Sequence, residues 1–104
     1  MVEWLEKWYK KQCDGDWEHM FGVQIYTLDN PGWRVKIDIA DTELEEKYFE
    51  EYKEYIDDND WIMCQIKDKK FDAGGDPSKL EKIIYIFKEW AESWVGITTK
   101  LPHR

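Results

Sequence analysis

Residues Phe21 to Ile39 read FGVQIYTLDNPGWRVKIDI and contain two alternating runs separated by one turn. Strand-favouring residues take every second position from Phe21 to Leu28 and again from Trp33 to Ile39, which is typical of half-buried strands. Between the two runs, Pro31 presets φ and Gly32 accepts a positive φ, so residues 29–32 are expected to turn. The stretch therefore predicts an antiparallel hairpin.

Helical spacing marks both ends of the chain. Apolar residues predict a helix from about Val2 to Gln12, ended by Asp14-Gly15-Asp16. Near the C-terminus, Asp76 is expected to cap a second helix whose first turn holds Pro77. Gly96 is expected to end it. Its apolar stripe is Leu80, Ile83, Ile84, Phe87, Trp90, Ala91, Trp94 and Val95.

The segments between hairpin and C-terminal helix are less regular. Alternation from Trp61 to Lys67 predicts a strand, and Asp68-Lys69 is expected to turn it into a short strand from Lys70 to Asp72, which Ala73-Gly74-Gly75 breaks. Leu44 to Ile56 has helical spacing, yet Phe49 to Ile56 is rich in strand-favouring aromatics. Both interpretations of that segment are open on composition and periodicity.

These elements predict an α+β fold made of an N-terminal helix, an antiparallel sheet of four to five strands built from hairpins, and a long C-terminal amphipathic helix packed on the sheet. With 104 residues, we expect one domain over residues 1–104. Thr98 to Arg104 is expected to be a frayed tail. The absence of a long apolar run and of a signal-peptide pattern predicts a cytoplasmic protein.

The net charge of −8 is concentrated in one segment. Residues 41–60 contain ten acidic residues and two lysines, so this segment alone has a net charge of −8. The acidic and basic residues of the other segments are equal in number. This excess argues against a nucleic-acid or anionic-membrane partner, since either requires a basic face. Two interpretations remain, a solvated face or a patch that steers a basic partner toward the protein.

The sequence shows no convincing catalytic or cofactor motif. Cys13 and His19 are the only pairing that suggests a nucleophile and its base, and the acids around Cys13 would blunt its thiolate. Cys64 alternates with Ile62 and Ile66, as a buried small hydrophobe does. Neither a metal-ligand spacing nor a phosphate-binding glycine fingerprint is present. Asp14, Asp16, Glu18 and His19 could suggest a metal site, but the longer ligand series of a calcium loop is absent, and turn chemistry explains Asp14 and Gly15.

Trp17 lies among Asp16, Glu18 and His19, outside any periodic pattern. A tryptophan surrounded by charge is typical of an interface hot spot, and it is equally typical of a lid over a core. Trp33 opens an alternating strand and is expected to hold the core. We expect the loops DGDWEH and LDNPGW to meet beside the first hairpin.

Three motifs carry a family resemblance: QCDGDWEH at Gln12 to His19, LDNPGW at Leu28 to Trp33, and DWIMC at Asp60 to Cys64. With the helix containing EKIIYIFKEW, they resemble the Immunity protein 53 family of bacterial polymorphic toxin systems over nearly the whole chain. The resemblance implies a small α+β antitoxin that binds and neutralises a cognate toxin domain, and it favours a strand from about Phe49 to Ile56 pairing with Trp61 to Lys67.

On this interpretation the partner is a protein, no cofactor is needed, and the chain is not an enzyme. The alternative is a small enzyme or sulfur-transfer (rhodanese-related) protein using Cys13 and His19. The residues expected to contact the toxin are Asp14, Asp16, Trp17, Glu18, His19, Asp29, Asn30, Glu50, Glu51, Glu54, Asp57 and Asp58.

Overall fold

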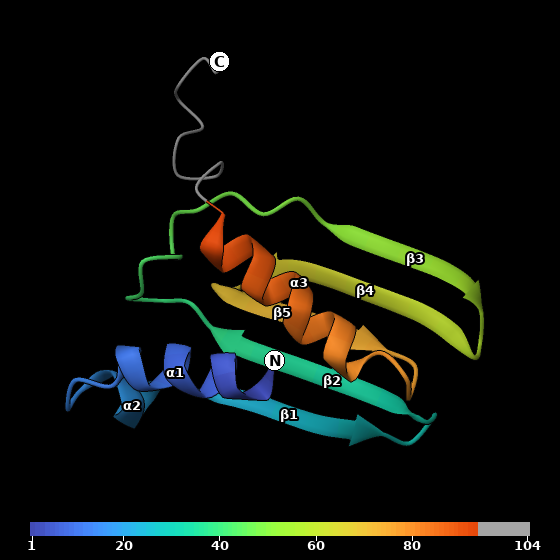
Figure 1. The fold of residues 1–104 in the computed structure, drawn as a ribbon, viewed down its shortest axis with the longest axis horizontal. Helices are drawn as coiled ribbons and strands as arrows, with labels where there is room; N and C mark the ends of the chain where they lie inside the picture. The colour runs from blue at the N-terminus through green and yellow to red at the C-terminus, as the bar shows by residue number, and fades with distance from the viewer. Residues whose placement is uncertain (94–104) are drawn as a thin grey trace, which may run out of the picture.

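The computed structural model describes residues 1–93 and confirms the α+β fold (Figure 1). Its elements in chain order are α1 (Val2–Gln12), α2 (Trp17–Met20), β1 (Val23–Leu28), β2 (Gly32–Asp38), β3 (Tyr52–Asp57), β4 (Asp60–Lys67), β5 (Lys70–Gly75) and α3 (Leu80–Glu92). The five strands form one antiparallel sheet in the order β1-β2-β5-β4-β3. The sheet is therefore built from three hairpins, with the β2–β5 pairing joining the first to the others.

The first hairpin is confirmed with its register. Val23 pairs with Ile37 at one end and Leu28 with Gly32 at the other. The β4–β5 hairpin turns at Asp68 and Lys69, as predicted, and both residues have positive φ, 54° and 58°. Two adjacent positive φ angles match the twist of the flanking strands, which is why two-residue hairpins use them.

Strand β5 does not end at Asp72, so the predicted break at Ala73-Gly74-Gly75 is wrong. The strand continues to Gly75, paired with β2 on one side and β4 on the other. Glycine weakens an isolated strand, but here ladders on both sides hold the backbone. The absence of a side chain at Gly75 also allows close packing, because a Cβ there would lie 2.7 Å from Cβ of Lys79.

The helical interpretation of residues 44–56 is wrong, and the strand favoured by the resemblance is confirmed, beginning at Tyr52. Residues 40–51 instead form an irregular segment, and three of its side chains pack inward. Leu44 is fully buried, Nζ of Lys47 donates to the carbonyl oxygen of Trp90 at 2.7 Å, and the Phe49 ring lies 5.2 Å from the Trp90 ring. Residues in this segment are therefore buried at a helical spacing although the segment is not a helix.

Helix α1 has the predicted bounds, whereas α3 begins three residues after Pro77. Asp76 caps the turn that precedes α3, where its carboxylate accepts the N–H of Ser78 at 2.8 Å. Helix α3 ends at Glu92, with Ser93 in an extended conformation, before the predicted end at Gly96. Trp94, Val95, Gly96 and the tail Thr98 to Arg104 lie outside the described residues.

Helices α1 and α3 lie on one face of the sheet (Figure 1). Beneath them are the fully buried residues Val35, Ile37, Cys64, Phe71 and Ala73. The Phe87 ring is central, with its centroid 5.1 Å from that of Trp8 and 5.0 Å from that of Phe71. Interdigitated aromatic rings of this kind bury large apolar area and contribute most of the packing energy.

Candidate functional site

Three turns that are distant in the sequence lie at the same end of the sheet. They are the β1–β2 turn (29–31), the β3–β4 turn (58–59) and the β5–α3 loop (76–79), all at the right in Figure 1. Together they enclose a groove of about 480 Å³, which we call the three-turn groove. Its lining residues are Asn30, Pro31, Tyr55, Asp58, Asn59, Trp61 and Pro77.

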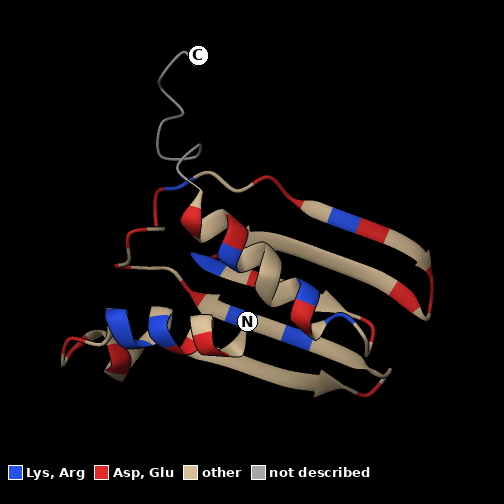
Figure 2. Cartoon of the chain, viewed as in Figure 1, with Lys and Arg blue, Asp and Glu red and all other residues tan. Residues whose placement is uncertain are grey.

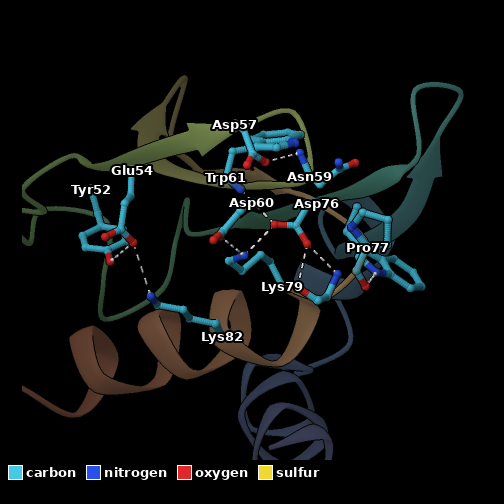
Figure 3. Close-up of polar contacts among 12 residues, drawn as sticks. Tyr52, Glu54, Asp57, Asn59, Asp60, Trp61, Asp76, Pro77, Lys79 and Lys82 are labelled. Carbon is cyan, nitrogen blue, oxygen red and sulfur yellow. Dashed lines mark hydrogen bonds and ion pairs between the residues drawn. The ribbon is translucent and has the colours of Figure 1, made fainter.

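Asp76 fixes the inner wall of the three-turn groove (Figure 3). Only 1% of this residue is exposed. Its carboxylate accepts the backbone N–H of Trp61 at 2.9 Å and the ammonium of Lys79 at 2.5 Å, as well as both the N–H and the hydroxyl of Ser78. The N–H of Asp76 donates in turn to the carbonyl oxygen of Trp61 at 3.1 Å. Trp61 is thereby held through both of its backbone polar groups.

The same contacts keep Asp76 ionised. Burial acts to raise its pKa, but the hydrogen bonds from Lys79, Ser78 and Trp61 outweigh burial and hold the pKa well below its usual range. The hydrogen bonds to Asp60 and Asp76 raise the pKa of Lys79. Lys79 is therefore engaged by two carboxylates, with Nζ–Oδ distances of 2.7 Å to Asp60 and 2.5 Å to Asp76.

Glycines allow the turns to approach one another. A Cβ on Gly32 would lie 2.6 Å from the carbonyl oxygen of Gly75, so no larger residue fits there without a backbone shift. Gly74 lies under the Trp61 ring, whose nearest atom would be 3.5 Å from an added Cβ. The paired glycines before α3 therefore serve close packing.

The outer rim of the three-turn groove is polar. The Tyr55 hydroxyl donates a short hydrogen bond to Asp58, which raises the pKa of Tyr55. The N–H of Asn59 donates to the carboxylate of Asp57 at 2.8 Å, which shapes the β3–β4 turn. Tyr55 is 63% exposed and pairs across the strands with Trp61, so both rings belong to one sheet face.

Acidic residues lie at the β1–β2 and β3–β4 turns of this end of the sheet, while basic residues lie in the β5–α3 loop and at the start of α3 (Figure 2). Asp29, Asp57 and Asp58 are exposed, and none of them forms an ion pair with any residue from 1 to 93. Two neighbouring acids do form ion pairs: Asp60 pairs with Lys79, and Glu54 pairs with Lys82 at 3.7 Å. The uncompensated acids of the β3–β4 turn thus lie beside the groove.

Other acids of residues 41–60 have internal partners. Glu43 accepts the indole N–H of Trp8 at 3.0 Å, and Glu45 pairs with Lys69 at 2.6 Å, a hydrogen bond that lowers the pKa of Glu45. Glu51 pairs with Lys53 at 3.6 Å, while Glu50 is exposed just before β3. The segment is therefore only partly available to a partner.

The DGDWEH loop is a self-contained hydrogen-bonded turn. The Asp14 carboxylate accepts the N–H groups of Asp16 and Trp17, each at 2.9 Å, and these bonds lower the pKa of Asp14. The Glu18 carboxylate accepts the N–H groups of Asp14 and Gly15. Gly15 has φ of 96°, which favours glycine. Hydrogen bonding and backbone conformation within the loop therefore explain the presence of Asp14, Gly15 and Glu18 in this motif.

Trp17 begins the short helix α2, an element not predicted from the sequence. It is 4% exposed, and its indole N–H donates to the carbonyl oxygen of Ala40 at 2.9 Å, which favours the core interpretation over the hot spot. Asp16 and His19 remain exposed. The expectation that this loop meets LDNPGW is wrong, because β1 separates them and places them at opposite ends of the sheet (Figure 1).

The cysteines lie apart in the fold. The Cys13 thiol donates to the carbonyl oxygen of Tyr9 at 3.4 Å, and Cys64 is fully buried in β4, where burial raises its pKa to about 12. Among residues 1–93, no group of three or more His, Cys, Asp or Glu side chains is arranged to hold a metal ion. None of the described helices has the length and apolarity needed to cross a membrane.

The three-turn groove contains residues that sequence reasoning missed. Of the residues expected to contact the toxin, Asn30 and Asp58 line the groove, Asp29 lies on the β1–β2 turn and Asp57 is the last residue of β3. Tyr55, Trp61 and Pro77 also line the groove and are not among the expected contacts. The available signal was the alternation in β4. Ile62, Cys64 and Ile66 face the helices, so Trp61 lies on the opposite face, where a tryptophan has no core to fill.

The comparisons with known proteins identify the family. The profile described as Immunity protein 53 matches residues 2–92, from the first residue of α1 to the last residue of α3. No curated protein and no solved structure matches the chain. The profile covers most of the 104 residues, including the whole sheet and the three-turn groove. The chain therefore belongs to the Immunity protein 53 family.

Proposed function

We propose that this chain is an immunity protein that binds and neutralises a cognate bacterial toxin domain through protein–protein contact, in the cytoplasm of the cell that makes the toxin. The single observation that carries the proposal is membership of the Immunity protein 53 family across residues 2–92. An inhibitor of this kind needs a complementary surface rather than a reaction centre.

Binding rather than catalysis is supported by the placement of Cys13 and His19. The Cys13 thiol is engaged with the carbonyl oxygen of Tyr9, one helical turn earlier, and not with His19. A nucleophile needs a base within hydrogen-bond reach and a third group that orients the base. The acids around this loop, Asp14 and Glu18, instead accept backbone N–H groups.

We propose the acidic end of the sheet as the contact surface. Asp29, Asp57 and Asp58 carry charge that is not neutralised within the described part of the chain, and they border a groove with aromatic and proline walls. Opposite charge on the toxin would raise the association rate. If the toxin is a nuclease, its substrate groove is basic, and this acidic surface would occupy the place of phosphate.

The test is to co-express the chain with the protein encoded next to it, purify through a tag on one partner, and measure cell survival when the toxin is induced. The proposal predicts a co-purifying complex and survival that Cys13→Ala and His19→Ala leave intact. Survival that either substitution abolishes, in variants that still fold, would support the enzyme instead. Failure of any complex to form would contradict the proposal.

A further inference from the structure

We infer that the three-turn groove receives an arginine side chain of the toxin domain, with the guanidinium stacked between Trp61 and Tyr55 and paired with the carboxylate of Asp58. This inference rests on the proposed function and names the contact through which it acts. It commits to one occupant, an arginine on an exposed loop of the toxin.

The shape of the groove fits a flat, elongated group. Its walls are the rings of Trp61 and Tyr55 and the two prolines, Pro31 and Pro77, and its volume is about 480 Å³. Sites of about 300–1,000 Å³ with apolar walls and a few polar groups are typical of ligand recognition. The polar groups here, Asn30, Asp58 and Asn59, belong to two turns.

The groove is also preorganised. Trp61 is held by Asp76 through its N–H at 2.9 Å (Figure 3) and its carbonyl oxygen at 3.1 Å. Gly74 lies under the Trp61 ring. Tyr55 is tied to Asp58 by its hydroxyl. Side chains ordered before binding cost little conformational entropy when the partner arrives, so more of the contact energy appears as affinity.

Charge complementarity selects a cation. Asp58 lines the groove, Asp29 lies on the β1–β2 turn and Asp57 is the last residue of β3. None of the three forms an ion pair within residues 1–93. Lys79 lies beside the groove but is held between Asp60 and Asp76, so it does not neutralise Asp58. An apolar occupant would desolvate the Asp58 carboxylate and leave its charge balanced only by the Tyr55 hydroxyl, which is costly.

Arginine fits this combination better than lysine. The guanidinium is planar, stacks on aromatic rings and can donate two parallel hydrogen bonds to one carboxylate. It is also more weakly hydrated than an ammonium, so less free energy is lost when it leaves water. Cation–π attraction is strongest over tryptophan, and Trp61 forms the wall of the groove.

The experiment compares two groove variants with two matched controls in the purified complex. Tyr55→Ala removes a ring that is 63% exposed, and its control Tyr48→Ala removes a ring that is 64% exposed outside the groove. Asp58→Asn removes one exposed charge, and its control Glu46→Gln removes another from the same acidic segment, at a residue not expected to contact the toxin. Urea unfolding checks that every variant folds.

We expect Tyr55→Ala and Asp58→Asn each to weaken toxin binding about thirtyfold, mainly through faster dissociation, as hot-spot substitutions do. The controls should change the dissociation constant by less than about threefold. Tyr55→Phe keeps the ring and should retain most of the affinity, which separates loss of stacking from any disturbance of β3. Equal losses of affinity in the groove variants and the control variants would overturn the inference. The acids would then act only through long-range electrostatic steering of the toxin.

Substitution of the toxin's exposed arginines, each to alanine and to lysine, identifies the occupant. One arginine should be coupled to both Tyr55 and Asp58 in double-mutant cycles, by about fivefold or more in the dissociation constant. Lysine at that position should not restore affinity. If the wild-type complex forms but no arginine couples to the groove, this inference fails while the proposed function stands. If no complex forms, the proposed function itself fails.

Discussion

Asp76 and Trp61 exchange two hydrogen bonds: the Asp76 carboxylate accepts the N–H of Trp61 at 2.9 Å, and the N–H of Asp76 donates to the carbonyl oxygen of Trp61 at 3.1 Å. These bonds join the loop before α3 to the start of β4. They couple the packing of the C-terminal helix to the position of the Trp61 ring in the three-turn groove.

Replacing Asp76 should destabilise the whole domain. Asp76→Asn places an amide N–H₂ where the carboxylate accepts the Lys79 ammonium and the Trp61 N–H, so buried donors lose their acceptor. We expect a loss of about 2–4 kcal/mol in the free energy of unfolding, measured by urea denaturation. Asp60→Asn is the control, because the Asp60 side chain is 55% exposed, and it should cost about 1 kcal/mol or less. Equal costs would contradict the account.

The contribution of Asp76 should also disappear in acid. Its pKa in the folded protein lies below the unfolded value of about 3.9, so the stabilisation is complete well above that pH and is lost as the pH falls toward the folded pKa. The difference in unfolding free energy between the wild type and Asp76→Asn should therefore be constant near neutral pH and narrow below about pH 4. A difference that narrows already near pH 6 would mean that another group is responsible.

Two glycines give a matched test of the close approach between turns. In Gly32→Ala the new Cβ would lie 2.6 Å from the carbonyl oxygen of Gly75, and we expect a loss of about 2 kcal/mol or more. In Gly22→Ala the Cβ meets nothing within 4 Å, and stability should stay equal or rise by up to about 1 kcal/mol. Thermal or urea unfolding measures the stability of the two variants. If Gly32→Ala is as stable as the wild type, the space around Gly32 is not crowded.

Much of the fold follows from sequence periodicity, because the elements involved bury one face against one core. Alternation in residues 21–39 predicts β1 and β2, and helical spacing predicts α1 to the residue. Periodicity failed in residues 40–51, where Leu44 and Lys47 are buried by an irregular chain whose partners come from elsewhere. It also failed at Gly74 and Gly75, where two neighbouring ladders hold a backbone of low intrinsic strand preference.

The candidate site was only partly predictable for a related reason. Asn30, Trp61 and Pro77 are far apart in the sequence, and the strand order β1-β2-β5-β4-β3 brings them together at one end of the sheet. Local composition identified the acids Asp57 and Asp58 but gave equal weight to DGDWEH, whose acids accept backbone N–H groups at the other end of the sheet.

Trp17 separates a structural role from a binding role. Trp17→Phe loses the hydrogen bond to Ala40 and leaves that carbonyl without this donor, so we expect a loss of about 1–3 kcal/mol in unfolding free energy. The affinity for the toxin should change by less than about threefold, because Trp17 is only 4% exposed. Calorimetric titration at a temperature where the variant is folded measures the affinity. A large loss of affinity with unchanged stability would restore Trp17 as a contact residue.

Neutralisation by binding can be measured by titrating a fixed amount of active toxin domain with the purified chain and recording the toxin activity that remains. If the chain acts by binding, this activity decreases linearly to a floor at a fixed molar ratio, and the ratio is the same for the wild type and for Cys13→Ala combined with His19→Ala. Progressive loss of toxin activity at a small fraction of that ratio, abolished by the double substitution, would show turnover and contradict neutralisation by binding.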